Sequence, residues 1–302
     1  MKNKHLISVV GPTAIGKTST SIELASHFDS EIISADSRQF FKEMRIGTAV
    51  PSEEELATVP HHFIQQLSVE ENYSVGDFER DALAKINELF HQHDILFLVG
   101  GSGLYINAIN EGLDDFPEVP KAIREELNQV HQKKGIESLQ ERLKELDPAY
   151  YQKVDVHNPH RLIRALEICI ATGKPYSSYR NHKKSKRSFQ SIKIGIDAER
   201  QIIYDRINQR VDLMMENGLL EEVQNLLSRK HLNALNTVGY KELFAYLENE
   251  ISLKKAIEEI KKNTRRFAKR QLTWFRKDET IKWFDYQEPT KNIIDYINQN
   301  TH

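Results

Sequence analysis

Cysteine and long apolar runs are both scarce in this sequence. Only one cysteine, Cys169, occurs in 302 residues, which excludes a disulfide framework and fits a reducing compartment. The longest strand-like apolar run, residues 95–99, is far shorter than a membrane span. The segment before Gly11 has too short an apolar stretch for a signal peptide. These absences predict a cytoplasmic protein with no membrane segment.

Acidic residues are missing from two segments, although the chain as a whole has a net charge of −2. Residues 180–193 hold six Lys and Arg, and residues 261–277 hold eight, with no acid in either segment. The remainder of the chain is acidic, so the two segments predict a localised site for a polyanion. One such segment alone would indicate a solvated helix face or loop. The aromatic side chains of Phe267, Trp274 and Phe275 between the charges favour nucleic acid.

Strand-like and helix-like segments alternate in the first part of the chain. Residues 6–10, 31–36 and 95–99 have strand character, and a helix follows the first and the last of them. Residues 73–92 are amphipathic with a helical period, and Ser74 is the expected N-cap. This alternation predicts an α/β fold, with a parallel sheet flanked by helices on both faces.

The pattern changes after Gly112. Residues 114–192 carry prolines and then helical periodicity, which predicts a helical insertion domain. Strand character resumes at residues 191–199, and from residue 200 onward the chain is expected to be almost entirely helical. We therefore predict a core formed by 1–113 and 193–302, with an insertion over 114–192.

A phosphate-binding loop follows the first predicted strand. The spacing G-x-x-x-x-G-K-T places Gly11, Gly16, Lys17 and Thr18 between a strand and a helix. The glycines let successive backbone N–H groups point at phosphate oxygens, Lys17 would neutralise the terminal phosphate, and Thr18 would hold Mg²⁺. The motif predicts a P-loop NTPase-like core, but it does not specify which phosphate compound is bound. A chance glycine turn is the alternative.

Asp36 is the one aspartate that ends a predicted strand. The apolar run 95–99 leads into glycine, whereas an NTP hydrolase is expected to have an aspartate there for Mg²⁺. Asp36 could be a metal ligand, a general base, or a cap of the following turn. Strand ends face the ligand crevice in such sheets, which favours a chemical role.

The adjacent His61 and His62 do not indicate a metal site. Neighbouring residues in an extended segment point apart, and no other Cys or His lies at ligand spacing. We interpret both histidines as structural.

A series of sequence blocks resembles the tRNA dimethylallyltransferase family, also called tRNA isopentenyltransferases. In order they are "GPTAIGKT", "ISADSRQFF", "IGTAVPSEEEL" with "PHHFI", "YSVGDFERDA", "LVGGSGLYI", "NPHRLIRALEI" with "TGKP", "NTVGYKEL" and "RRFAKRQLTWFR". They span about residues 6–285. The resemblance implies transfer of a dimethylallyl group from dimethylallyl diphosphate to N6 of the adenosine adjacent to the anticodon in tRNA.

The resemblance also implies roles for single residues. Asp36 would be the general base that removes a proton from the adenine amine, and Lys17, Arg206 and Mg²⁺ on Thr18 would stabilise the leaving diphosphate. The residues implied to bind the diphosphate are Gly11, Pro12, Thr13, Ala14, Ile15, Gly16, Lys17 and Thr18.

Contacts with the tRNA anticodon stem-loop are implied in six regions, including the helical insertion. They are Asp36, Ser37, Arg38 and Gln39; Ser102; Arg124; His160, Arg161, Leu162, Ile163 and Arg164; and Gly239, Tyr240 and Lys241 with Lys269, Arg270, Gln271, Trp274 and Arg276. Without the family, ordinary surface ion pairs would explain Arg161 and Arg164 almost as well. We expect a monomer.

Four positions depart from the family pattern. Ile15 stands where a small residue is common, Phe41 replaces a usual tyrosine, Val50 replaces a usual lysine, and Gln65 stands where an aspartate often follows the histidine pair. They concern the fine positioning of the donor and of RNA, not the reaction class.

Three alternatives stay open at this point. A relative that prenylates free adenine nucleotides would share the chemistry but would need neither the helical insertion nor the basic segment 261–277. A P-loop kinase or ATPase would turn over NTP without an allyl diphosphate. A non-catalytic RNA-binding module would not depend on Asp36.

Overall fold

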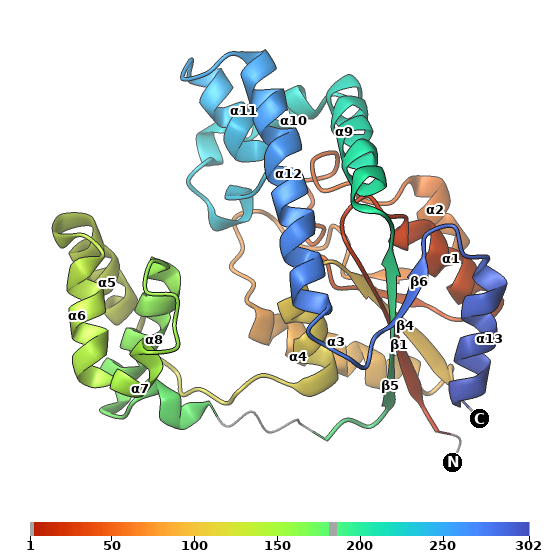
Figure 1. Cartoon of the computed structure of the whole chain (residues 1–302), viewed down its shortest axis with the longest axis horizontal. Helices are drawn as coiled ribbons and strands as arrows, with labels where there is room; N and C mark the ends of the chain where they lie inside the picture. Colours follow the sequence, from red (N-terminus) through yellow and green to blue (C-terminus); the bar gives the residue numbers. More distant parts are fainter. Residues whose placement is uncertain (1–2, 181–185, 302) are drawn as a thin grey trace. The chain divides into compact units, whose positions relative to one another are not determined.

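The core of the fold is a six-stranded parallel sheet in which the first strand of the chain lies in the interior (Figure 1). The computed structural model describes residues 3–180 and 186–301, so residues 181–185 of the first basic segment lie outside the described part. The strand order is β3-β2-β4-β1-β5-β6. The strands are β1 His5–Val10, β2 Ile32–Ser34, β3 His61–His62, β4 Ile95–Gly100, β5 Gln190–Asp197 and β6 Lys282–Asp285.

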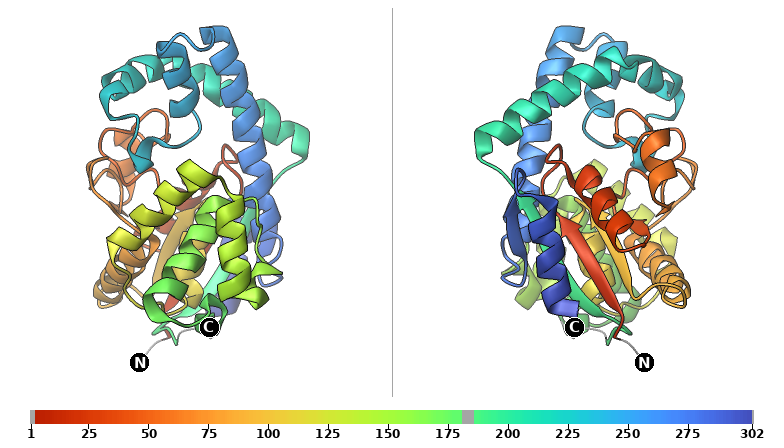
Figure 2. Two further views of the ribbon diagram at one scale, coloured as in Figure 1. Left: turned by 90° about the vertical axis from the view of Figure 1, so that its left-hand side faces the viewer. Right: turned by 90° about the vertical axis from the view of Figure 1, so that its right-hand side faces the viewer.

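Helices cover both faces of the sheet. Every residue of β1 is therefore buried, and its side chains alternate between two apolar clusters, one on each face. Helices α1 (Lys17–His27) and α13 (Thr290–Thr301) pack on the cluster that contains Ile7 and Val9. Helices α3 (Val75–Leu89) and α4 (Gly103–Glu111) pack on the opposite face (Figure 2). The predicted parallel sheet flanked by helices is thus confirmed.

The predicted start of α3 is also confirmed. Ser74 accepts a hydrogen bond from the backbone N–H of Asp77 at 3.2 Å, and the Asp77 carboxylate accepts one from the Ser74 N–H at 2.9 Å. This reciprocal capping box satisfies two backbone donors that the first helical turn leaves without partners.

Two short strands were not predicted, and the expectation that the chain after residue 200 is almost entirely helical was wrong at β6. Strand β6 has only four residues and pairs with β5 at the sheet edge. Its Trp283 packs against Gly195 so closely that a Cβ there would lie 2.4 Å from the ring. Such a short strand carries little periodicity, and only its pairing with β5 reveals it.

Four helices and three short ones extend the sheet unit beyond the strand ends. They are α9 Arg200–Glu216, α10 Leu219–Asn225, α11 Tyr240–Leu247 and α12 Leu253–Phe275, with α2 Glu53–Thr58, η2 Leu227–Arg229 and η3 Asn233–Leu235. The long basic helix α12 packs against α9 and α11. Among the described residues, no helix combines the length and apolar character needed to cross a membrane.

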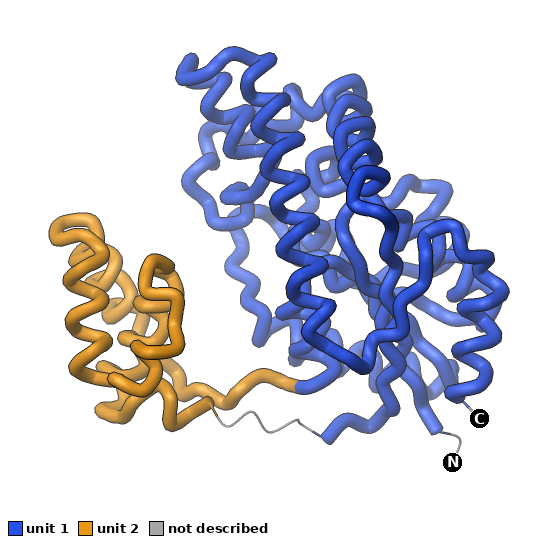
Figure 3. The backbone as a smooth tube through the Cα atoms, viewed as in Figure 1, with its two compact units in different colours: residues 1–111, 186–302 blue, residues 112–185 orange. Residues whose placement is uncertain are grey.

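The remaining helices form a separate compact unit. Residues 1–111 and 186–302 make up the core unit, and residues 112–185 make up the helical unit (Figure 3). The helical unit holds α5 Lys121–Lys134, α6 Glu137–Leu146, α7 Pro148–Tyr151, α8 Pro159–Thr172 and η1 Tyr176–Tyr179 around an apolar cluster of its own. The limits predicted for the insertion were 114 and 192. Strand β5 begins at Gln190, so the last residues of that range belong to the sheet.

A carboxylate clamp holds the loop after β2 against the C-terminal helices. Glu222 on α10 accepts hydrogen bonds from the backbone N–H groups of Arg45 at 2.9 Å, Ile46 at 2.7 Å and Gly47 at 2.9 Å. It also accepts one from the hydroxyl of the fully buried Tyr240 at 2.6 Å. A Cβ on Gly47 would lie 2.6 Å from the Tyr240 ring, so the close approach requires glycine.

We expect Glu222→Ala to lower the free energy of unfolding by about 3 kcal/mol, because it leaves three backbone donors and a phenol without their acceptor. Urea unfolding followed by circular dichroism measures this change. The neighbouring Glu221 is exposed and serves as the control; Glu221→Ala should stay within about 0.5 kcal/mol of the wild type. Equal effects of the two substitutions would contradict the clamp.

Candidate active site

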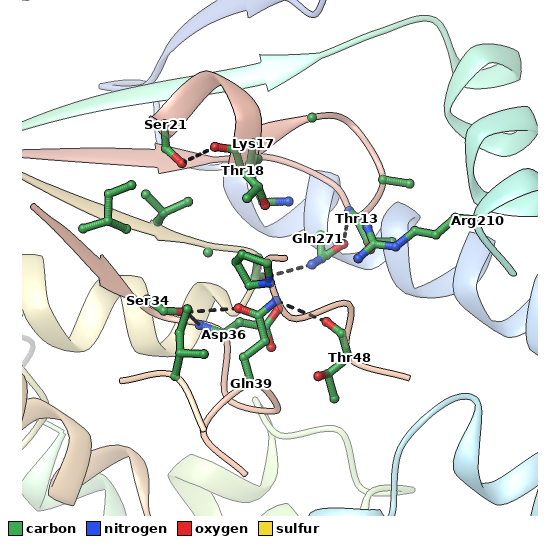
Figure 4. Close-up of a pocket in the computed structure, with 18 of the residues that line it drawn as sticks. Thr13, Lys17, Thr18, Ser21, Ser34, Asp36, Gln39, Thr48, Arg210 and Gln271 are labelled. Atoms are coloured by element: carbon green, nitrogen blue, oxygen red, sulfur yellow. Dashed lines mark hydrogen bonds between the residues drawn. The ribbon is translucent and has the colours of Figure 1, made fainter. Parts of the chain in front are cut away.

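Three loops meet where strands β1, β2 and β4 end. The P-loop follows β1, Asp36 follows β2, and the glycine turn Gly101–Gly103 follows β4. Because the three strands are parallel neighbours, their carboxyl ends lie at the same edge of the sheet. Figure 4 shows Lys17, Thr18, Asp36 and Arg210 around one cavity at this edge.

The P-loop presents an open helix N-terminus. Gly16 adopts the left-handed conformation with φ 109°, and α1 begins directly after it at Lys17. No described side chain caps this end of α1, and its first turn contains no acid. A Cβ on Gly11 would lie 2.4 Å from the Ile196 carbonyl oxygen, so the loop can pass β5 only with glycine at this position. The exposed N–H groups and the helix dipole make this end suited to an anion.

Lys17 is held over the loop. Its Nζ donates a hydrogen bond to the Pro12 carbonyl at 2.7 Å. Burial lowers the pKa of Lys17 to about 8, while the charge of Asp36 raises this pKa and that of Arg210 lowers it. The ammonium therefore sits in a desolvated position where an anionic ligand would stabilise its protonated form.

Two arginines reach the loop from α9, one helical turn apart. The Nε of Arg206 donates to the Ala14 carbonyl at 2.8 Å, and its guanidinium lies 5.5 Å from the centre of the Tyr286 ring. Arg210 is half-buried; desolvation lowers its pKa, and the charge of Asp36 acts in the opposite direction. Sequence reasoning found Arg206 but missed Arg210. Its signal was the i, i+4 spacing within "YDRINQR", which puts both side chains on one helix face.

Asp36 has a partner within its own turn. Its Oδ1 accepts a hydrogen bond from the Arg38 backbone N–H at 3.1 Å, which fixes the carboxylate relative to the end of β2. The interpretation of Asp36 as a cap of the following turn is therefore correct for this hydrogen bond. The same side chain also lines the cavity beside Lys17 and Arg210, so the cap alone does not account for its position.

Two adjoining cavities meet at Asp36. The first, of about 430 Å³, is lined by the P-loop, α9 and apolar side chains that include Ile32 and Ile64. The second, of about 700 Å³, is lined by residues from the Arg38 loop, the Gly239 region and α12. Both cavities are lined by Thr13, Asp36, Thr48, Gly101, Arg210, Phe267 and Gln271. A group in the first cavity can thus meet a group in the second beside a carboxylate.

Most residues predicted to bind tRNA in the core unit line these cavities. The second cavity includes Ser37, Arg38, Ser102, Gly239, Lys241, Arg270, Gln271 and Trp274, and Gln39 lines the first. Tyr240 is buried and bonded to Glu222 instead. Lys269 is exposed on α12, and the exposed Arg276, which directly follows this helix, pairs with Asp197 at 2.7 Å.

Three exposed apolar side chains stand at the second cavity. Leu104 is 47% exposed, Trp274 41% and Phe267 39%, and these values place them among the most exposed large apolar residues described. Sequence reasoning did not select Leu104. Exposed apolar and aromatic surface lining a cavity is suited to a ligand with apolar faces.

The predicted RNA residues of the helical unit fall into two groups. Glu167 is buried and accepts two hydrogen bonds from Arg124, at 2.6 and 2.7 Å, and a further one from Arg164. Although burial raises the pKa of Glu167, these arginines hold it below its usual value. His160 and Arg161 are exposed at the start of α8, whereas the side chains of Leu162 and Ile163 are buried in the apolar cluster. The ion-pair alternative thus describes Arg164, and it also accounts for Arg124.

The first basic segment contributes to the fold through its later residues. Arg187 donates to Glu79 at 2.6 Å and to two backbone carbonyls of α4. Lys193 is buried between Glu111 at 3.1 Å and Asp278 at 2.5 Å. These two cations are therefore neutralised within the core unit and do not form a surface for a polyanion.

Within the described ranges, no group of three or more His, Cys, Asp or Glu could hold a metal ion. His61 Nδ1 contacts the Val59 carbonyl at 2.7 Å, and His62 Nε2 contacts Glu31 at 2.6 Å. Thr18 lines the first cavity next to Lys17. Mg²⁺ keeps several waters and commonly uses one or two protein ligands beside phosphate oxygens, so a threonine hydroxyl next to a bound diphosphate fits this ion.

Comparisons with known proteins find relatives over nearly the whole chain. The family described as IPP transferase matches residues 39–278. The tRNA dimethylallyltransferase of Christiangramia forsetii is 64% identical over 295 residues, which cover 98% of each chain. That of Flavobacterium johnsoniae is 59% identical over 303 residues, again with 98% of each chain covered.

Two solved structures share the fold. The full-length tRNA isopentenylpyrophosphate transferase of Bacillus halodurans aligns with a TM-score of 0.74 and 38% identity, covering 99% of this chain and 97% of that one. A eukaryotic dimethylallyltransferase acting on tRNA aligns with a TM-score of 0.83 and 25% identity, covering 98% of this chain and 80% of the other. Both similarities extend over the core unit and the helical unit.

The lowered pKa of Lys17 predicts how anion binding depends on pH. A bound diphosphate favours the ammonium, so affinity for inorganic pyrophosphate should fall as the pH rises through about 8. Calorimetry on the wild type and on Lys17→Arg, whose cation does not titrate in this range, cancels the titration of pyrophosphate itself. Between about pH 7.5 and 9.5 the wild type should lose more than about tenfold relative to this variant. If affinity falls equally with pH in the wild type and in Lys17→Arg, Lys17 does not titrate in this range as proposed.

Proposed function

Because the chain belongs to the IPP transferase family, it is a prenyltransferase, and we propose that it transfers a dimethylallyl group from dimethylallyl diphosphate to N6 of the adenosine adjacent to the anticodon in tRNA. The names of its relatives, tRNA dimethylallyltransferases, support this reaction. One observation supports the roles proposed for the two cavities: Asp36 lines both the P-loop cavity and the cavity beside α12.

The first cavity is suited to the donor. Its P-loop end offers Lys17, Arg206 and the N-terminus of α1 to a diphosphate, while Ile32 and Ile64 offer apolar contact to a five-carbon chain. The diphosphate gains negative charge as the allylic C–O bond breaks. Donors and cations that are already in place stabilise that charge without reorganisation. Mg²⁺ on Thr18 would add a further positive charge to the leaving group when bound.

Asp36 is assigned as the general base. The exocyclic amine of adenine is a weak nucleophile, because its lone pair is delocalised into the ring. Removal of a proton as the new C–N bond forms contributes about 10²- to 10⁴-fold to such reactions. Asp36 lies at the junction of the cavities, where an amine from the second could meet the allylic carbon from the first.

The second cavity is suited to an adenine taken out of an RNA loop. Leu104, Phe267 and Trp274 offer apolar faces for stacking, and Arg38, Lys241 and Arg270 offer positive charge to the backbone. A free adenine nucleotide would need fewer of these groups, which favours RNA as the acceptor. The helical unit adds the exposed His160 and Arg161, which we propose contact the anticodon stem-loop.

The deciding experiment incubates the purified protein with dimethylallyl diphosphate, Mg²⁺ and unmodified tRNA, followed by mass spectrometry of the nucleosides. We expect dimethylallyl-adenosine at the position next to the anticodon. Parallel reactions contain adenosine monophosphate instead of tRNA, or ATP without prenyl donor. Product on the free nucleotide alone, or steady ATP hydrolysis with no prenyl transfer, would overturn the assignment.

Replacing Asp36 tests the base. Asp36→Asn keeps an oxygen that can accept the Arg38 N–H but cannot take a proton, so kcat should fall by at least about 10²-fold. Pyrophosphate affinity should be retained or increased, because the substitution removes a negative charge from the cavity. Single-turnover kinetics with anticodon stem-loop RNA and calorimetry measure the two quantities. An unchanged kcat would remove Asp36 from this role.

Salt dependence tests the RNA surface on α12. For each phosphate that a basic side chain no longer neutralises, the slope of log K against log salt should become shallower by about 0.7–0.9, so the Lys269→Gln/Arg270→Gln double variant should flatten it by up to about 1.8. The control is Lys261→Gln, since Lys261 already pairs with Asp212 at 2.6 Å. Fluorescence anisotropy with labelled stem-loop RNA measures the slopes. A larger change for Lys261→Gln than for the double variant would place the RNA elsewhere.

A further inference from the structure

Gln271 joins the basic helix α12 to the donor loop. Its side chain is buried, its Oε1 accepts the backbone N–H of Thr13 at 2.9 Å, and its Nε2 donates to the Gly101 carbonyl at 2.9 Å. Thr13 belongs to the P-loop and Gly101 to the turn after β4. One amide, which lies 170 residues after Gly101 and 258 after Thr13 in sequence, therefore connects two active-site loops to α12.

The glycine turn extends this connection to Asp36. Ser102 accepts a hydrogen bond from the Ser37 backbone N–H at 3.4 Å, and the two serine hydroxyls lie 3.3 Å apart. The ring of Trp274 packs on Gly103, where a Cβ would lie 2.3 Å from the indole. The turn thus contacts α12 twice, and it contacts the residue that directly follows the proposed base.

The same helical turn that carries Gln271 presents groups to the RNA cavity. Phe267, Gln271 and Trp274 follow the i, i+4, i+7 spacing of one helix face, and Arg270 lines the same cavity. Gln271 is buried among the loops, whereas Trp274 and Arg270 are exposed. A helix turn is stiff, so a ligand that displaces this part of α12 through Trp274 also displaces the Gln271 amide three residues earlier.

We propose that Gln271 is a positioning residue that couples RNA binding on α12 to the P-loop, so that RNA and the donor diphosphate bind more tightly together than alone. This proposal rests on the proposed function in one respect, that RNA is the ligand that binds α12. It predicts a reciprocal free energy between two binding sites, and it can be measured without catalysis.

The experiment measures binding of labelled anticodon stem-loop RNA with and without saturating inorganic pyrophosphate. In the wild type, pyrophosphate should tighten RNA binding about fivefold or more. Two substitutions remove the link from opposite sides: Gln271→Met removes the amide, and Gly101→Ala places a Cβ 2.1 Å from Nε2 and displaces it. In each, the effect of pyrophosphate should fall below about twofold, and the double variant should show no further loss.

Thr273→Ala is the matched control on the same helix, because Thr273 is exposed and its hydroxyl bonds only to the Lys269 carbonyl among the contacts described. It should keep the wild-type coupling. Gly101→Ala leaves the sequence of α12 intact, so it decides the matter if Gln271→Met folds poorly by circular dichroism. Absence of coupling in the wild type, or its persistence in Gly101→Ala, would overturn the proposal. Coupling without any prenyl product would instead leave the proposal standing and contradict the proposed reaction.

Discussion

The active site depends on desolvated positive charge beside the carboxylate of Asp36. Burial lowers the pKa of both Lys17 and Arg210, and the charge of Asp36 opposes this shift in each case. A polyanion that enters the first cavity would relieve the cost of keeping two desolvated cations together. The same electrostatics would stabilise a departing diphosphate more strongly than a bound ester, because charge builds up as the bond breaks.

Parallel strand topology brings these groups together. Strands β1, β2 and β4 are neighbours, so the loops after them share one edge of the sheet although the strands are separated in sequence. The C-terminal helices then close the site from the other side: α9 supplies Arg206 and Arg210, and α12 supplies Gln271. The Glu222 clamp ties the loop after β2 to these helices, so that the walls of the cavity belong to one packed unit.

Much of the fold and part of the site could be predicted from the sequence, where the signal is local. The P-loop spacing, the capping box at Ser74 and the ordered family blocks depend on residues close to one another in the chain, and fold, family and enzyme class are confirmed. The signal failed for β6, which is too short to show a period, and for Arg187 and Lys193, whose charges are neutralised by residues far away. The roles of Asp36 and of the predicted RNA residues stay predictions.

The sequence by itself determined which chemical groups are available: a glycine loop with lysine and threonine, a strand-end aspartate, and a basic aromatic helix. Only the tertiary structure decided which of them act together. It buried Tyr240 and Leu162 in the fold, paired Arg124 with Glu167, and brought Arg210 and Gln271 to the P-loop. Local backbone preferences extend over a few residues, whereas the pairing of charges and buried amides is set by packing between distant segments.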